Sequence, residues 1–167
     1  MHVVGVEFVE RPIREFFEEH KMEYTVEEHP SEGYSVYKHG DRLTIYRCDV
    51  FTVSEEMLGA RCDFLWDRGA LVAIGYEHKK RYSGVIQSVL APHAEGLVEA
   101  MSYDRSLHPG PPYSTSEEDV KNFFGSHCAV EKLSDRKTSE IPKWYASSIA
   151  GLADADWRTF YLKVKGE

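Results

Sequence analysis

The sequence predicts an α/β fold with a mainly parallel sheet. Short apolar runs rich in β-branched residues alternate with segments of helical periodicity, which is the pattern of strands connected by helices. The hydrophobic fraction of 42% excludes a disordered chain, and 167 residues is the length of one ordinary domain. We therefore expect residues 1–167 to form a single domain.

The first third of the chain predicts a strand, a helix and a hairpin. Residues 3–9 are β-branched and apolar, and Pro12 then fits the first turn of a helix. Residues 34–37 and 43–46 read as strands on either side of the turn-rich connector 38–41. An antiparallel hairpin is therefore expected here.

The middle of the chain predicts a buried strand followed by a helix. Residues 54–59 fit at most one helical turn that glycine ends, and residues 62–66 read as a buried strand. Apolar residues recur at helical spacing over residues 78–90, which leaves the basic residues 79–81 for solvent.

The last third predicts one clear strand and one clear helix. Residues 97–103 read as a strand, and the Ser-Glu-Glu-Asp segment that opens residues 116–125 predicts a capped helix. Residues 129–133 and 159–164 are weaker strand candidates, and residues 144–155 are ambiguous.

Charge and cysteine usage exclude several functional classes. The formal charge of -8 comes from interleaved acids and bases, so no basic face for nucleic acid is expected. No apolar run has the length of a membrane span, and no signal segment is visible, which together predict a cytoplasmic protein. Cys48, Cys62 and Cys128 are too widely spaced to predict a disulfide framework or a zinc site, and the histidines show no metal-ligand spacing.

Acidic residues follow two of the predicted strands, where open α/β sheets bind ligands. Glu7 could accept hydrogen bonds from the two hydroxyls of a nucleoside ribose, although an acid that opens a helix is an equally good interpretation. Asp49 could accept a hydrogen bond from an adenine amino group, with Val50 and Phe51 as apolar walls. The alternative for Asp49 is a turn residue that caps local backbone donors.

Asp67 and Arg68 follow a third strand and form the sharpest pair. An arginine at a strand end, beside an acid that can hold its side chain, offers a fixed planar donor to an anionic or polarised sulfur or a heterocycle nitrogen. A local ion pair that ties the strand end to the next helix is the alternative.

The proline-rich loop at residues 108–113 is expected to be rigid. Its three prolines fix φ and reduce the entropy lost on ordering. Tyr113 could stack on a flat ring, so Pro111, Pro112 and Tyr113 are predicted to form a wall beside the substrate. A plain surface turn is the alternative.

Residues 3–7, 66–74 and 101–113 together resemble the thiopurine S-methyltransferase family. The resemblance implies a Rossmann-like class I methyltransferase sheet, mainly parallel with an antiparallel C-terminal strand, and a monomer that uses S-adenosyl-L-methionine. It implies methyl transfer to an aromatic or heterocyclic thiol, a small-molecule substrate that reacts as a thiolate and needs orientation and a cation more than a general base.

The same resemblance assigns roles to the candidate residues. It places Glu7 at the cofactor ribose, Asp49 and Val50 beside the adenine, and Arg68 near both substrate and cofactor. A second cation near the C-terminus has no clear counterpart around residues 136–144. The Pro-Pro-Tyr sequence also resembles a loop of amino-group methyltransferases, but Gly110 replaces its asparagine.

The family's first strand and glycine-rich cofactor turn should lie upstream of Val3. We therefore expect an N-terminally truncated chain whose first strand is missing, which leaves the two flanking strands without partners and the chain prone to association. We also expect weak cofactor binding, because Glu7 and Asp49 would bind only the nucleoside part of the cofactor. The alternative function is a non-catalytic binding protein with the methyltransferase fold.

Overall fold

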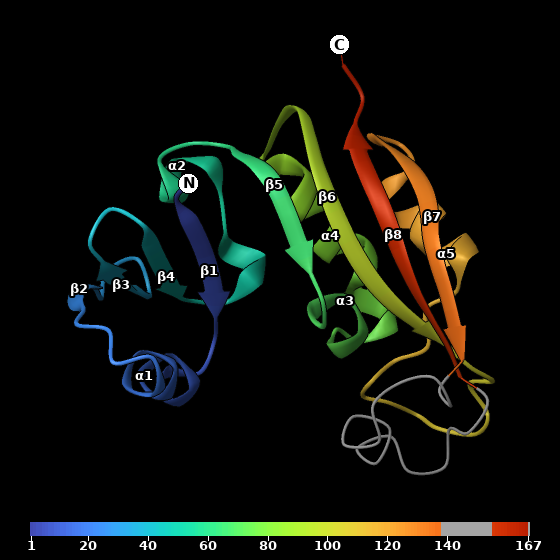
Figure 1. The fold of residues 1–167 in the computed structure, drawn as a ribbon, viewed down its shortest axis with the longest axis horizontal. Coiled ribbons are helices and arrows are strands. Elements are labelled where there is room, and N and C mark those ends of the chain that lie inside the picture. Colours follow the sequence, from blue (N-terminus) through green and yellow to red (C-terminus); the bar gives the residue numbers. More distant parts are fainter. Residues whose placement is uncertain (138–154, 167) are drawn as a thin grey trace. The chain divides into compact units, whose positions relative to one another are not determined.

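The computed structural model describes residues 1–137 and 155–166. The chain divides into two compact units, Met1–Val53 and Ser54–Glu167. Each unit contains its own four-stranded sheet (Figure 1).

The first unit places its strands in the order β1-β4-β3-β2. Its elements are β1 (Val3–Glu7), α1 (Glu10–Glu19), β2 (Thr25–His29), β3 (Tyr34–His39), β4 (Leu43–Arg47) and the 3-10 turn η1 (Val50–Thr52). β1 is parallel to β4, whereas β3 is antiparallel to both β2 and β4, so the predicted hairpin is confirmed. Ile13 and Phe17 on α1 pack with Tyr37 on β3 to form the core.

The second unit places its strands in the order β5-β6-β8-β7. Its elements are α2 (Glu55–Leu58), β5 (Cys62–Asp67), α3 (Ala70–Ala73), the 3-10 turn η2 (Tyr76–His78), α4 (Lys79–Ser88), β6 (Leu90–Ser102), α5 (Glu117–Phe124), β7 (Cys128–Lys137) and β8 (Asp156–Val164). Helices α3, α4 and α5 lie on one face of this sheet (Figure 1). Ser116 and Asp119 form the reciprocal capping box that starts α5, as the sequence predicts.

The α/β fold is confirmed, but the expectation of a mainly parallel sheet is wrong, because both described sheets are mixed and most of their strand pairs are antiparallel. β1–β4 and β5–β6 are parallel pairs, while the other pairs in the described sheets are antiparallel. The hairpin adds antiparallel pairs to the first sheet. The C-terminal strand β8 is antiparallel to both of its neighbours, as expected.

Each sheet ends on an apolar strand with a neighbour on one side only. β1 lies at one end of the first sheet and β5 at one end of the second. Val3 and Val6 on β1 and Phe64 and Trp66 on β5 are exposed. Within the described residues, β1 and β5 therefore each have one edge without a strand partner.

Three details differ from the sequence predictions. β5 is not a buried strand, because it borders the sheet and leaves Trp66 58% exposed. β6 begins at Leu90, so the preceding helix is shorter and the strand longer than expected. Lys79 is fully buried, not in solvent, because it lies one helical turn before Tyr82 and Ser83 on the inward face of α4.

Candidate functional site

Glu7 and Asp49 lie at the ends of two adjacent parallel strands of the first unit. Glu7 is the last residue of β1 and lies opposite Arg47, the last residue of β4. The backbone N–H of Cys48 donates to the carbonyl of Glu7 at 3.0 Å, which keeps the two strand ends together as the chain turns into Asp49. The two acids therefore lie at the same end of the first sheet, as their sequence positions predict.

Both acids also cap local turns. Glu7 Oε1 accepts the Val9 N–H at 2.7 Å, and Asp49 Oδ1 accepts the Phe51 N–H at 2.9 Å at the start of η1. Within the described residues, the second oxygen of each carboxylate accepts no hydrogen bond. One acceptor on each side chain is thus open to a ligand, and two such acceptors fit ribose hydroxyls and an amino group. Val50, half-buried, opens η1 beside them.

Asp67 is a structural acid at the end of β5. Its side chain is buried, and Oδ1 accepts the backbone N–H groups of residues 69–71 at 3.0 to 3.3 Å. Oδ2 accepts the Tyr82 hydroxyl at 2.9 Å. Burial raises the pKa of the carboxyl group, and these hydrogen bonds oppose the rise. Asp67 therefore fixes the turn from β5 into α3.

Arg68 is held by Glu99, not by Asp67. Its Nε lies 3.7 Å from Glu99 Oε2, and its side chain remains 57% exposed. The expectation that Asp67 holds the arginine is wrong, because the backbone and Tyr82 already use both carboxylate oxygens. Arg68 therefore presents its guanidinium at the carboxyl end of β5, as predicted, but its carboxylate partner is Glu99.

Glu99, which the sequence does not indicate, brings Arg68 together with residues of two other strands. It also lies 3.8 Å from Arg136 Nη2 on β7, and its Oε2 accepts the Trp157 indole N–H at 3.2 Å. Two guanidinium groups thus share one carboxylate, and neither contact is a tight ion pair. Arg136 lies at the start of the stretch where no second cation could be placed from the sequence. No local sequence motif indicates Glu99, because its three partners lie at the ends of other strands and are distant in the sequence.

Hydrogen bonds to the backbone, in addition to the three prolines, restrain the loop at residues 108–113. The Tyr113 N–H donates to the Val72 carbonyl on α3 at 2.6 Å, and the Tyr103 hydroxyl donates to the Pro112 carbonyl at 2.5 Å. Lys79 Nζ donates to the Tyr113 carbonyl at 3.3 Å. Pro111 is exposed, and Pro112 and Tyr113 are half-buried. Preorganisation is therefore built into the backbone of the loop.

The predicted substrate wall and Arg68 are connected through α3. Arg68 precedes this helix by two residues, and the helix residue Val72 accepts the hydrogen bond from Tyr113. Trp157 is buried in one cluster with Val72 and Met101, so it packs in the core behind α3 and β6.

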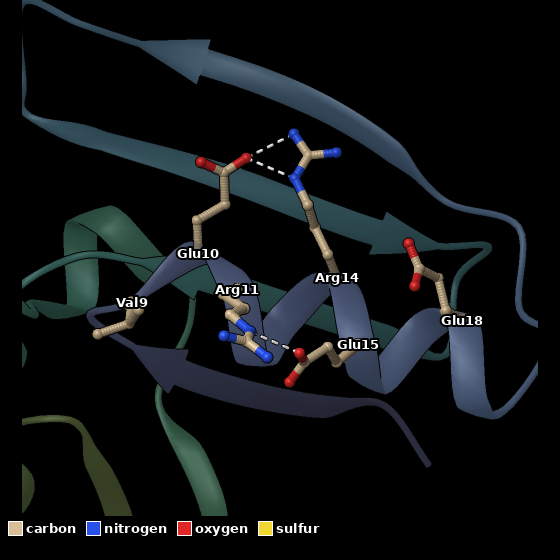
Figure 2. Close-up of a pocket in the computed structure, with 6 residues that line it drawn as sticks. All are labelled: Val9, Glu10, Arg11, Arg14, Glu15 and Glu18. Atoms are coloured by element: carbon tan, nitrogen blue, oxygen red, sulfur yellow. Dashed lines mark hydrogen bonds and ion pairs between the residues drawn. The ribbon is translucent and has the colours of Figure 1, made fainter.

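A hollow on α1 contains none of the predicted site residues. Figure 2 shows its lining, which is Val9, Glu10, Arg11, Arg14, Glu15 and Glu18. The pairs Arg11–Glu15 and Glu10–Arg14 lie one helical turn apart and are largely exposed. This is the solvated face of a helix, so we assign it no site.

Residues 1–137 and 155–166 contain no group of three or more histidine, cysteine or acidic side chains that could hold a metal ion. Cys48, Cys62 and Cys128 are free thiols. No described helix is both long and apolar enough to cross a membrane.

Comparison of the fold identifies methyltransferases among solved structures. An N1-methyltransferase of Burkholderia thailandensis, with bound 1,6-didemethyltoxoflavin and S-adenosylhomocysteine, matches 98% of this chain and 61% of its own, with a TM-score of 0.59 at 16% identity. The N-methyltransferase NodS of Bradyrhizobium japonicum, in complex with S-adenosylhomocysteine, matches 98% and 66%, with a TM-score of 0.60 at 10% identity. At these identities the likeness shows the class I methyltransferase fold.

Sequence comparison identifies the family. The zebrafish (Danio rerio) probable thiopurine S-methyltransferase is 36% identical over 133 residues, covering 78% of this chain and 57% of its own length. The mouse (Mus musculus) thiopurine S-methyltransferase is 39% identical over 136 residues, covering 80% and 56%. The chain thus spans a little over half the length of these relatives. The family model described as thiopurine S-methyltransferase matches residues 1–158, and the chain therefore belongs to the thiopurine S-methyltransferase family.

Proposed function

We propose that this chain takes part in S-adenosyl-L-methionine-dependent methyl transfer to an aromatic or heterocyclic thiol. Family membership supports the reaction class. One structural observation supports the assignment of the site: Arg68 presents an exposed guanidinium two residues before α3, and Val72 on that helix accepts the hydrogen bond of the Tyr113 N–H. We also propose a cytoplasmic location, a small-molecule substrate and one methyltransferase-like domain.

Arg68 would stabilise the thiolate form of the substrate. Glu99 restrains the guanidinium at 3.7 Å without forming a tight pair, so its N–H donors can turn toward an anionic sulfur. Arg136 shares the same carboxylate and is the candidate for the second cation. Both positive charges would favour an anionic substrate over its neutral form.

The residues near Arg68 would orient the ring and not act as a base. Tyr113, with Pro111 and Pro112, would form a flat wall against an aromatic thiol. Asp67 would act indirectly, because its oxygens fix the turn that carries Arg68. Aromatic thiols ionise readily, so the protein needs only to hold the thiolate in line with the methyl group and to place a cation beside its sulfur.

Glu7 and Asp49 would bind the nucleoside part of the cofactor. Each presents one open carboxylate oxygen at the same end of the first sheet. S-adenosyl-L-methionine, when bound, supplies the methyl group. Val50 would provide an apolar contact for the adenine.

The experiment has two arms with one matched control. Calorimetric titration with S-adenosylhomocysteine measures cofactor binding, and product formation from thiophenol measures methyl transfer. We expect Arg68→Ala to lower turnover by roughly a hundredfold while cofactor affinity changes little. Arg61→Ala removes an arginine of the same unit that pairs with Glu55, and it should change neither quantity.

Other outcomes would change the assignment. Equal loss of cofactor affinity, with turnover otherwise intact, would move Arg68 to the cofactor. Cofactor binding with no product from any aromatic thiol would overturn the proposed reaction and favour a binding protein with the methyltransferase fold.

A further inference from the structure

Lys79 is a buried cation that the proposed reaction leaves unused. It is the first residue of α4, and its side chain has no solvent exposure. Nζ donates to the Tyr113 carbonyl at 3.3 Å and, at shorter range, to the Thr115 hydroxyl. Both acceptors are neutral, and no carboxylate of the described residues bonds to Nζ. Burying an ammonium group this way is costly, so its position requires an explanation.

The two acceptors of Lys79 lie in the segment that carries the predicted substrate wall. Backbone hydrogen bonds hold this segment to α3 and β6, because the Tyr113 N–H donates to the Val72 carbonyl and the Thr115 N–H donates to the Met101 carbonyl at 2.7 Å. Lys79 reaches the same segment from α4. The Thr115 hydroxyl also donates to the Tyr113 carbonyl at 3.1 Å, so the amine, the hydroxyl and the carbonyl form a closed triangle.

We propose that Lys79 is a positioning residue whose protonation state sets the placement of Tyr113 and so the binding of the thiol substrate. As an ammonium group it can donate to both oxygens at once. As a neutral amine it has fewer donors and a lone pair, so the Thr115 hydroxyl can donate to Nζ instead of to Tyr113. The carbonyl of Tyr113 then loses a partner, and the aromatic wall loosens. This proposal rests on the proposed function of the loop.

The charges around Lys79 come from three other segments. Asp119 on α5 and Asp67 at the end of β5 favour the ammonium form, and Arg105 after β6 disfavours it. Asp119 is already engaged, because Arg105 Nη2 lies 2.8 Å away and the Tyr76 hydroxyl donates to it at 2.8 Å. Burial is the largest effect and lowers the pKa of Lys79 to about 8. The change of state thus falls about one pH unit above neutrality.

The test compares Lys79→Met with Lys80→Met, a neighbouring lysine that is exposed on the same helix. Backbone amide shifts of Tyr113 and Thr115 are followed by NMR across a pH titration, without substrate or cofactor. We expect the wild type and Lys80→Met to show a step centred near pH 8 and Lys79→Met to lack it. In the methylation assay, Lys79→Met should raise the KM for thiophenol by roughly tenfold and change kcat little. A tenfold change corresponds to the loss of one or two hydrogen bonds.

A second variant guards against misfolding. Lys79→Arg keeps a permanent charge and should abolish the pH step, whatever the effect of the methionine. A step that persists in both variants would overturn the proposal, as would a fall in kcat with KM unchanged. If no thiol is methylated, the proposed function fails, and the amide titration still decides whether Lys79 controls the loop.

Discussion

The acids at the ends of β1 and β4 differ from the acid at the end of β5 in their hydrogen bonds. Glu7 and Asp49 each accept one hydrogen bond from a nearby backbone N–H and keep one oxygen open. Asp67 is buried and accepts four hydrogen bonds from its own unit. The sequence position is alike in all three cases, so the number of protein donors separates an acid that can bind a ligand from one that supports the fold.

The largest effect should follow removal of the buried acid. Asp67→Ala leaves three backbone N–H groups and the Tyr82 hydroxyl without their acceptor, and the Leu71 N–H and the Tyr82 hydroxyl among them are buried. We expect the free energy of unfolding in urea to fall by about 4 kcal/mol. Asp63→Ala, an exposed position on the same strand, is the control and should change it by less than about 0.5 kcal/mol. Similar losses for both variants would show that the buried hydrogen bonds of Asp67 do not stabilise this unit.

The buried lysine should make stability depend on pH. The folded-state pKa of Lys79 is lowered to about 8 from 10.5, so between these values the unfolded chain holds more protons and stability rises with pH. Relative to Lys79→Met, the free energy of unfolding of the wild type should rise by up to about 3 kcal/mol across this interval. Below pH 8 the difference between the two proteins should not change with pH. Urea unfolding at several pH values measures the difference, and a flat difference would mean that Lys79 ionises as it does in water.

The open acids should affect ligand binding and not stability. Glu7→Gln and Asp49→Asn retain the shape of each side chain and remove its charge. Each should weaken S-adenosylhomocysteine binding by roughly tenfold, the value of one charge-assisted hydrogen bond, as measured by calorimetry. Unfolding should change by less than about 0.5 kcal/mol. Unchanged affinity in both variants would remove these acids from the cofactor site.

The smallest effect on stability should come from the exposed edge of β5. Phe64 and Trp66 lie on a strand that pairs on one side only, which favours association between copies. Trp66→Lys should lower concentration-dependent association in analytical ultracentrifugation and leave unfolding nearly unchanged. Asp63→Lys, at an exposed position on the same strand, controls for added charge. Equal association of both variants and the wild type would assign the contact to another surface.

Local patterns predicted the hairpin, the capping box of α5 and the position of Arg68 after a strand. They failed where a side chain is defined by distant partners. Lys79 has the inward spacing of Tyr82, but its charge suggested solvent, because the oxygens of Tyr113 and Thr115 that receive it lie far along the chain. Glu99 was missed for the same reason, since a lone acid within a strand carries no motif. Sequence therefore specified the strand ends better than the hydrogen-bond partners of the residues on them.

Gly110 leaves the space that the ring of Tyr113 occupies. Its φ of +91° favours glycine, and a Cβ atom at this position would lie 2.4 Å from Tyr113 Cδ1, inside the ring's own space. A smaller residue at 113 would remove this clash, but the positive φ would still strain any side chain at 110. Glycine at 110 is therefore a condition for the aromatic ring at 113, since even the methyl group of alanine would displace it.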